Sequence, residues 1–139
     1  LARHEKLAGT ERDEAAANIK ALAASAKAYD SLLADTAALA AARGKSFEAD
    51  KTAHAALTGE LTMASEKLAG ATASNDAARV AALRTEEAEV KTRLKMSAAK
   101  LRVSGEVAAQ AGKRSAVEAG KVQEVRALLA DTLRLALSC

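Results

Sequence analysis

The segment ATASND, at residues 71–76, divides the chain into two helix-forming halves. It follows KLAG at residues 67–70, where an apolar stripe ends in glycine, the residue most common just past a helix end. Ser74, Asn75 and Asp76 are all favourable N-cap residues, because their short side chains accept hydrogen bonds from free backbone N–H groups. The segment therefore predicts that one helix ends near Gly70 and that another begins at about residue 76.

Two further glycines fall where a bundle of shorter helices would turn. The sequence RGKS, at residues 43–46, offers basic residues at a helix C-terminus, then a glycine and a serine cap. Ser104 and Gly105 offer a weaker break, and Thr10 offers an N-cap near the start of the chain. These signals predict four helices, over about residues 10–43, 46–69, 76–102 and 105–139.

The composition favours helices throughout. Ala occupies 39 of the 139 positions and Leu a further 17, while Pro is absent, so good helix formers dominate and the strongest helix breaker is missing. Apolar residues also recur at helical three/four spacing on one side of each predicted helix. These stripe residues are Ile19, Leu22, Ala26, Tyr29, Leu33 and Ala40; Phe47, His54, Leu57, Leu61, Ala64 and Leu68; Val80, Leu83, Val90, Leu94 and Leu101; and Val107, Ala111, Val122, Val125, Leu129 and Ala136.

The predicted fold is therefore all-α: an antiparallel up-down-up-down four-helix bundle of long Ala-rich helices, forming one domain over residues 1–139. An extended three-helix or coiled-coil rod is the alternative architecture. The pentapeptide EKLAG occurs at residues 5–9 and again at 66–70, and a shift of 61 residues aligns glycines and stripe leucines without a gap. Two duplicated hairpins, about 5–65 and 66–139, are one explanation. The other is that two similar hairpins share a register because bundles require it.

His54 is the candidate residue for binding a cofactor, because it falls on the stripe of the second predicted helix and can face the interior. Against a haem or metal ligand, no other stripe position holds a histidine and no Glu-x-x-His motif occurs. The favoured interpretation is a structural histidine whose ring is held by Asp50, one turn earlier, or by a backbone carbonyl. His4, near the start of the chain, carries no functional prediction.

The sequence lacks a recognisable catalytic motif. Glu87 and Glu118 approach the stripes, and two facing carboxylates can act as acid and base. However, Glu87 lies four residues before Lys91, the favourable orientation for a helical ion pair, and Glu89 precedes Arg93 in the same way. No nucleophile turn, phosphate loop or Cys/His cluster occurs. The expectation is a protein that is not an enzyme and has no catalytic residues, no metal and no cofactor.

Basic residues are concentrated at residues 91–102, KTRLKMSAAKLR, which hold five basic side chains and no acidic one. On a helix these side chains flank the stripe on both sides, as snorkelling side chains do, whereas a nucleic-acid surface would gather them on one face. Nucleic acid is therefore not an expected partner. No apolar run approaches the roughly 18 residues of a membrane span. The single cysteine, Cys139, rules out an intrachain disulfide, and a first residue other than Met suggests a piece of a longer protein.

The sequence predicts a non-catalytic structural or protein-interaction bundle, as a segment of a longer rod or of a surface-exposed protein. Its partners would be other protein helices, including copies of itself, because a thin core favours self-association. One alternative is a bundle that binds haem or a small molecule around His54. Another is a stress-type amphipathic protein that becomes ordered on a lipid surface. The compartment is undetermined, with a soluble protein in the cytoplasm or exposed at the cell surface as the expectation.

Overall fold

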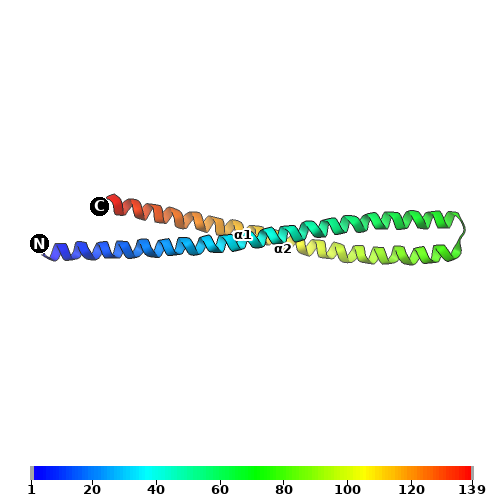
Figure 1. Ribbon diagram of the computed structural model, residues 1–139, viewed down its shortest axis with the longest axis horizontal. Coiled ribbons are helices and arrows are strands. Elements are labelled where there is room, and N and C mark those ends of the chain that lie inside the picture. Colours follow the sequence, from blue (N-terminus) through cyan, green and yellow to red (C-terminus); the bar gives the residue numbers. More distant parts are fainter. Residues whose placement is uncertain (1, 139) are drawn as a thin grey trace. The chain divides into compact units, whose positions relative to one another are not determined.

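The computed structural model describes residues 2–138 and, within them, all side chains except those of residues 2–4, 7, 136 and 138. Both elements in this range are α-helices: α1 spans Ala2–Ala73 and α2 spans Ala77–Ser138 (Figure 1). The all-α prediction is therefore confirmed for the described residues. Cys139, the side chain of His4 and the predicted stripe side chain of Ala136 lie outside the described part.

The described chain forms two long helices and not the four of the predicted bundle. α1 continues through Gly44 and α2 continues through Gly105, and no described glycine has a positive φ. A glycine inside a helix costs only about 1 kcal/mol relative to alanine, whereas a break leaves four N–H and four C=O groups without helical partners. Thr10 is no cap either, because its hydroxyl donates to the Lys6 carbonyl within α1. The predicted breaks are wrong because glycine alone does not end a helix.

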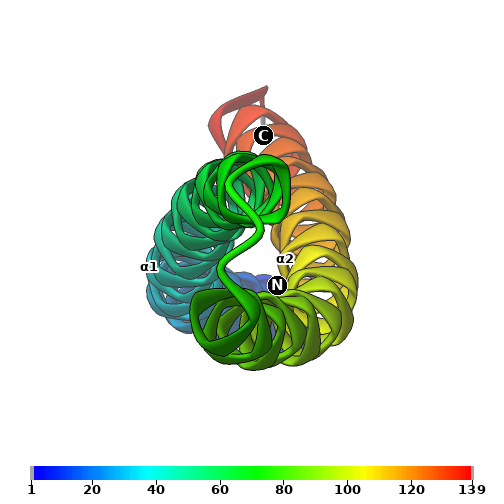
Figure 2. The ribbon, with the colours of Figure 1, turned by 90° about the vertical axis from the view of Figure 1, so that its right-hand side faces the viewer.

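The boundary predicted at residues 71–76 is confirmed, and its hydrogen bonds explain it. Asn75 is left-handed, with φ 56°. The N–H of Asn75 donates to the Thr72 carbonyl at 3.2 Å, and that of Asp76 to the Ala71 carbonyl at 3.4 Å, which is the Schellman arrangement at a helix end. Oδ1 of Asp76 in turn accepts from the Arg79 N–H at 3.2 Å, so Asp76 also caps α2. Figure 2 looks onto this short connection.

The chain is organised into two compact units. The turn unit is Ala41–Gln110, which contains the connection and the helix segment on either side of it. Its segments of α1 and α2 lie side by side and run antiparallel (Figures 1 and 2). The terminal unit combines Leu1–Ala40 with Ala111–Cys139, and an ion pair of 2.8 Å between Arg126 and Asp30 joins its two helix segments.

In both units most shielded positions recur alternately every three and four residues, and we call these positions the seam. In the turn unit they are Phe47, Asp50, His54, Leu57, Leu61, Ala64, Leu68 and Ala71 on α1, with Val80, Leu83, Glu87, Val90, Leu94, Ser97, Leu101 and Ser104 on α2. In the terminal unit they are Ala15, Ile19, Leu22, Ala26, Tyr29, Leu33, Thr36 and Ala40, with Ala111, Ser115, Glu118, Val122, Val125, Leu129 and Thr132. The shielded Gly44 and Ala108 continue this spacing, whereas the remaining shielded residues lie beside it: Gly105, Val107, Ala119 and Gly120. Every predicted stripe residue with a described side chain is buried or partly buried.

Candidate functional site

The seam of the turn unit contains a polar cluster between the two helices. His54, the sequence-predicted candidate, is partly buried, and its Nδ1 lies 3.2 Å from Oγ of Ser97 on α2. Asp50 does not hold the ring as expected. It pairs instead with Lys100 of α2, whose Nζ lies 3.4 Å from Oδ1. Ser97 was not predicted from the sequence, because it is polar and the predicted stripes consist mainly of apolar residues. It nevertheless lies three residues after Leu94 and four residues before Leu101, which is the spacing of the seam.

Asp50 is the most unusual member of this cluster, because a carboxylate occupies a position that normally holds an apolar side chain. It is only 9% exposed, and its Oδ2 is buried without a hydrogen-bond partner among the described residues. A buried carboxylate needs a partner to offset its lost hydration. Lys100 supplies one charge to Oδ1, so the cluster is only partly satisfied.

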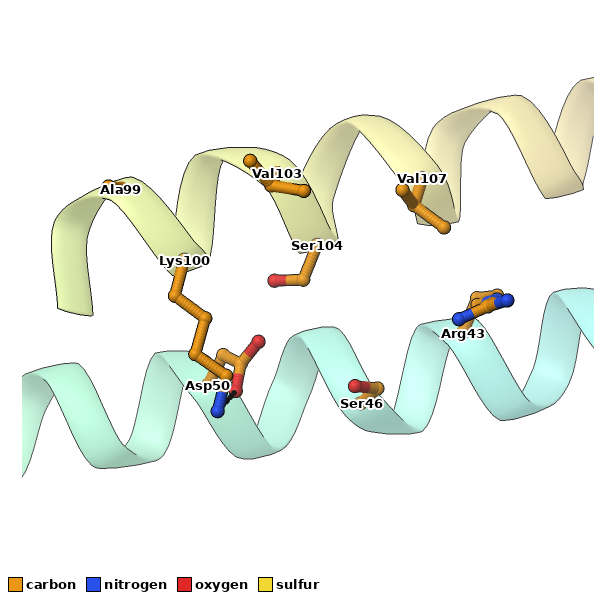
Figure 3. Close-up of a pocket in the computed structure, with 8 residues that line it drawn as sticks. All are labelled: Arg43, Ser46, Asp50, Ala99, Lys100, Val103, Ser104 and Val107. Atoms are coloured by element: carbon orange, nitrogen blue, oxygen red, sulfur yellow. Dashed lines mark ion pairs between the residues drawn. The ribbon is translucent and has the colours of Figure 1, made fainter. Parts of the chain in front are cut away.

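A shallow groove of about 440 Å³ lies beside this cluster, between the two helix segments of the turn unit. Figure 3 shows Lys100 reaching from α2 to Asp50 on α1. Arg43 lies seven residues before Asp50 on the same helix. The apolar lining comes from α2, and the full lining is Arg43, Ser46, Asp50, Ala99, Lys100, Val103, Ser104 and Val107. Arg43 is an exposed residue. The groove therefore combines apolar side chains from α2 with two cationic side chains and the Asp50 carboxylate.

Large apolar side chains also remain exposed outside the seam. They include Leu32 and Leu39 on α1 of the terminal unit, and Met96 and Val103 on α2 of the turn unit. The others are Met63, Val117, Leu128, Leu133, Leu135 and Leu137. By contrast, the buried apolar residues are Ala64, Ala71, Leu83, Val90 and Val122. Much of the apolar surface is thus outside the core that each helix pair forms.

Glu87 and Glu118, considered above as a carboxylate pair, belong to separate units and each has its own partner. Glu87 receives hydrogen bonds from Lys91 at 2.9 Å and from Ser65 across the seam at 3.1 Å, and these bonds lower the pKa of Glu87 below its ordinary value of 4.5. Glu118 is buried and pairs with Lys121 at 3.5 Å. The predicted Glu87–Lys91 pair is confirmed, and both carboxylates are engaged in structural contacts.

The basic segment at residues 91–102 is largely neutralised. Lys91 pairs with Glu87, Lys100 with Asp50, Arg93 with Glu60 and Arg102 with Glu106. Arg93 therefore pairs across the seam and not with Glu89 as expected from the helical spacing. Only Lys95 of the five has no ion-pair partner among the described residues.

The contact between His54 and Ser97 has the residue types of a base and a nucleophile. Acyl transfer also needs N–H donors aimed at the developing oxyanion. Ser97 lies in the middle of α2, where backbone N–H groups donate within the helix. Asp50, which would have to orient His54, is paired with Lys100. The His54–Ser97 contact is therefore better explained as a contact that holds α1 and α2 in register than as a base and nucleophile for acyl transfer.

The described part of the chain has neither a metal-binding cluster nor a membrane-spanning helix. No group of three or more His, Cys, Asp or Glu side chains within this part of the chain is arranged to hold a metal ion. Neither described helix has a stretch that is long and apolar enough to span a bilayer. No protein-family model, no curated protein and no solved structure matches the chain.

Proposed function

We propose that this chain is a non-catalytic structural or protein-interaction module that packs its helix pair against other protein helices. The observation that carries the proposal is the seam, whose shielded positions keep three/four spacing in both units. A sustained heptad repeat is the pattern by which helices of coiled coils recognise one another. The large apolar side chains exposed outside the seam supply surface for further helices.

The exposed surface area supports the same proposal. The chain exposes 10108 Å², whereas a compact monomer of 14.3 kDa exposes about 6,800 Å². The difference is about 3,300 Å² for one chain, and a permanent interface that buries about 2,000–5,000 Å² in total takes roughly half of that area from each partner. The described part of one chain supplies two helices, so a four-helix bundle would arise when this helix pair docks on a second helix pair.

Circular dichroism with and without lipid vesicles tests this function against the lipid-surface alternative. We expect high helicity and a cooperative thermal transition in plain buffer. Low helicity in buffer that rises only on adding vesicles of anionic lipid would overturn the proposal, because the helices would then depend on a membrane surface. Vesicles of neutral lipid serve as the control, since they lack the charge that attracts basic amphipathic helices.

A further inference from the structure

Two exposed rows, one in each unit, each place a charged residue between two apolar residues that are seven positions apart, and the two charges are opposite. On α1 of the terminal unit, Leu32 and Leu39 are 36% and 43% exposed, and the exposed Asp35 lies between them. On α2 of the turn unit, Met96 and Val103 are 69% and 52% exposed, with Lys100 between them. In both rows the outer residues are seven apart, so the three side chains share one helix face.

The two rows match when they run antiparallel. At 1.5 Å per residue, Asp35 lies about 4.5 Å beyond Leu32 along its helix and about 6 Å before Leu39. Read in the opposite direction, Lys100 lies about 4.5 Å from Val103 and about 6 Å from Met96. Leu32 then opposes Val103, Asp35 opposes Lys100, and Leu39 opposes Met96.

The same register continues without a charge conflict. One turn further toward the start of the terminal unit's α1 segment, Ala28 meets Val107. Val103, Val107 and Lys100 also line the groove of the turn unit, with Arg43 on its opposite wall. Arg43 and Asp35 have no ion-pair partner among the described residues, and the Lys100 side chain is 74% exposed despite its contact with Asp50. Arg43 is therefore unpaired within this part of the chain, and the Lys100 ammonium, although it contacts Asp50, remains accessible to an additional carboxylate.

We infer that the groove of the turn unit binds the terminal unit of a second copy of this chain, through the row Leu32, Asp35 and Leu39. This inference rests on the proposed function and names the partner and the surface. Asp35 of one copy forms ion pairs with Lys100 and Arg43 of the other, while the leucines cover Val103 and Met96. The contact joins unlike surfaces, so it closes as a reciprocal pair or continues from copy to copy.

Charge reversal in two separate proteins tests the inference by sedimentation velocity. Asp35→Lys places a second ammonium group against Lys100, and Lys100→Glu places a second carboxylate against Asp35. Each variant alone should therefore dissociate at least about tenfold more readily than wild type. In an equimolar mixture every contact between unlike copies regains an opposite-charge pair. Association in the mixture should therefore rise well above that of either variant alone, although it stays below the wild-type level because Asp35→Lys also faces the unchanged Arg43.

Matched controls keep the result interpretable. Asp13→Lys and Lys95→Glu make the same charge changes at exposed positions outside the two rows, and they should associate as wild type does. Because Lys100→Glu also removes the partner of Asp50, Val103→Glu provides a second groove variant that leaves the Asp50–Lys100 pair intact. It should weaken association as Lys100→Glu does, with unchanged helicity.

Three results would overturn the inference: a monomeric wild type at millimolar concentration, self-association that is indifferent to Asp35→Lys and Val103→Glu, or a mixture that shows no recovery. If helicity and cooperative melting persist in any of these cases, the specific surface is wrong and the interaction-module function stands. If helicity itself is absent in buffer, the proposed function fails with it. The two failures are thus distinguishable.

Discussion

Phe47 of α1 lies directly over Gly105 of α2, at a point where any larger residue would collide with it. A Cβ added at Gly105 would stand 2.9 Å from Cε2 of the Phe47 ring. Gly44, in the same unit, has no such neighbour within 4 Å of an added Cβ. The two glycines that the sequence marks as breaks therefore have different structural roles.

This difference predicts opposite effects of the same substitution. Gly44→Ala should raise the free energy of unfolding by about 0.5–1 kcal/mol, because alanine has the better helix propensity and the site is open. Gly105→Ala should lower the free energy of unfolding by about 1 kcal/mol, because displacing the Phe47 ring costs more free energy than the better helix propensity of alanine contributes. Urea unfolding of both variants measures the difference. In a Phe47→Ala background, Gly105→Ala should become stabilising, and persistent destabilisation there would show that the ring is not the cause.

The left-handed residue in the turn provides a second test. Asn75→Ala should destabilise the protein by about 1 kcal/mol, because alanine adopts a positive φ less readily than asparagine. Asn75→Gly should be neutral or slightly stabilising, since glycine reaches this conformation without strain. Thermal melting compares the two variants. Equal melting temperatures for both would contradict the left-handed conformation.

The Asp50–Lys100 pair predicts unequal effects for its two members. Lys100→Ala should cost about 1–3 kcal/mol, because it takes from the buried Asp50 carboxylate the cation that contacts it. Asp50→Leu should be neutral or stabilise by about 1–2 kcal/mol, because an apolar side chain fits the seam without desolvating a charge. Chemical denaturation gives both values. A larger loss for Asp50→Leu than for Lys100→Ala would mean that the pair is a net source of stability.

The hydrogen bonds to Glu87 should make the free energy of unfolding depend on pH, with a definite sign. Hydrogen bonds from Lys91 and Ser65 lower the pKa of Glu87 in the folded state, so the folded protein holds that carboxylate ionised more strongly than the unfolded chain does. The stabilisation from the ionised carboxylate is present when the pH is above 4.5, the ordinary pKa of this group. It is lost as the pH falls through the lowered pKa of the folded state. Glu87→Gln should therefore be less stable than wild type at pH 7 and converge with it in acid, below the lowered folded pKa. A stability gap that is unchanged by acid would rule out this contribution.

The ligand-binding alternative is tested at His54. Its Nδ1 is engaged with Ser97, and we expect haem to give the same absorption spectrum with wild type and with His54→Ala. A Soret shift that wild type shows and His54→Ala lacks would establish axial ligation and favour the cofactor-binding interpretation. His4→Ala is the matched control for the other histidine.

The sequence allowed the seam and one helix boundary to be predicted, because both depend on local signals. Apolar spacing identified residues such as Leu61 and Val90, and the polar run ending in Asp76 identified the connection. The breaks at Gly44 and Gly105 were wrong, because an amphipathic stripe on both sides of a glycine outweighs its small propensity cost. Nothing local shows that Gly105 accommodates Phe47, since the two residues meet only when the helices pair.

The candidate site was less predictable for a related reason. His54 was identified from its stripe position, but its partner depends on the register of α1 against α2. Asp50 lies on the same helix and was the nearest choice, whereas Ser97 is 43 residues away in sequence. The seam spacing continues unbroken through polar residues, and following it irrespective of polarity would have identified Asp50 and Ser97 together.

The connection between Ala73 and Ala77 has a kinetic consequence. Asp76 takes part in both the end of α1 and the start of α2. Closing this turn therefore brings together the seam residues of α1 and α2 that lie nearest to the connection, at little entropic cost. The turn unit should then fold outward from the connection, each added pair extending contacts already formed, on the microsecond-to-millisecond scale of low-contact-order helical proteins. Substitutions at Asn75 and Asp76 should slow folding, whereas those at the Phe47–Gly105 contact should mainly accelerate unfolding.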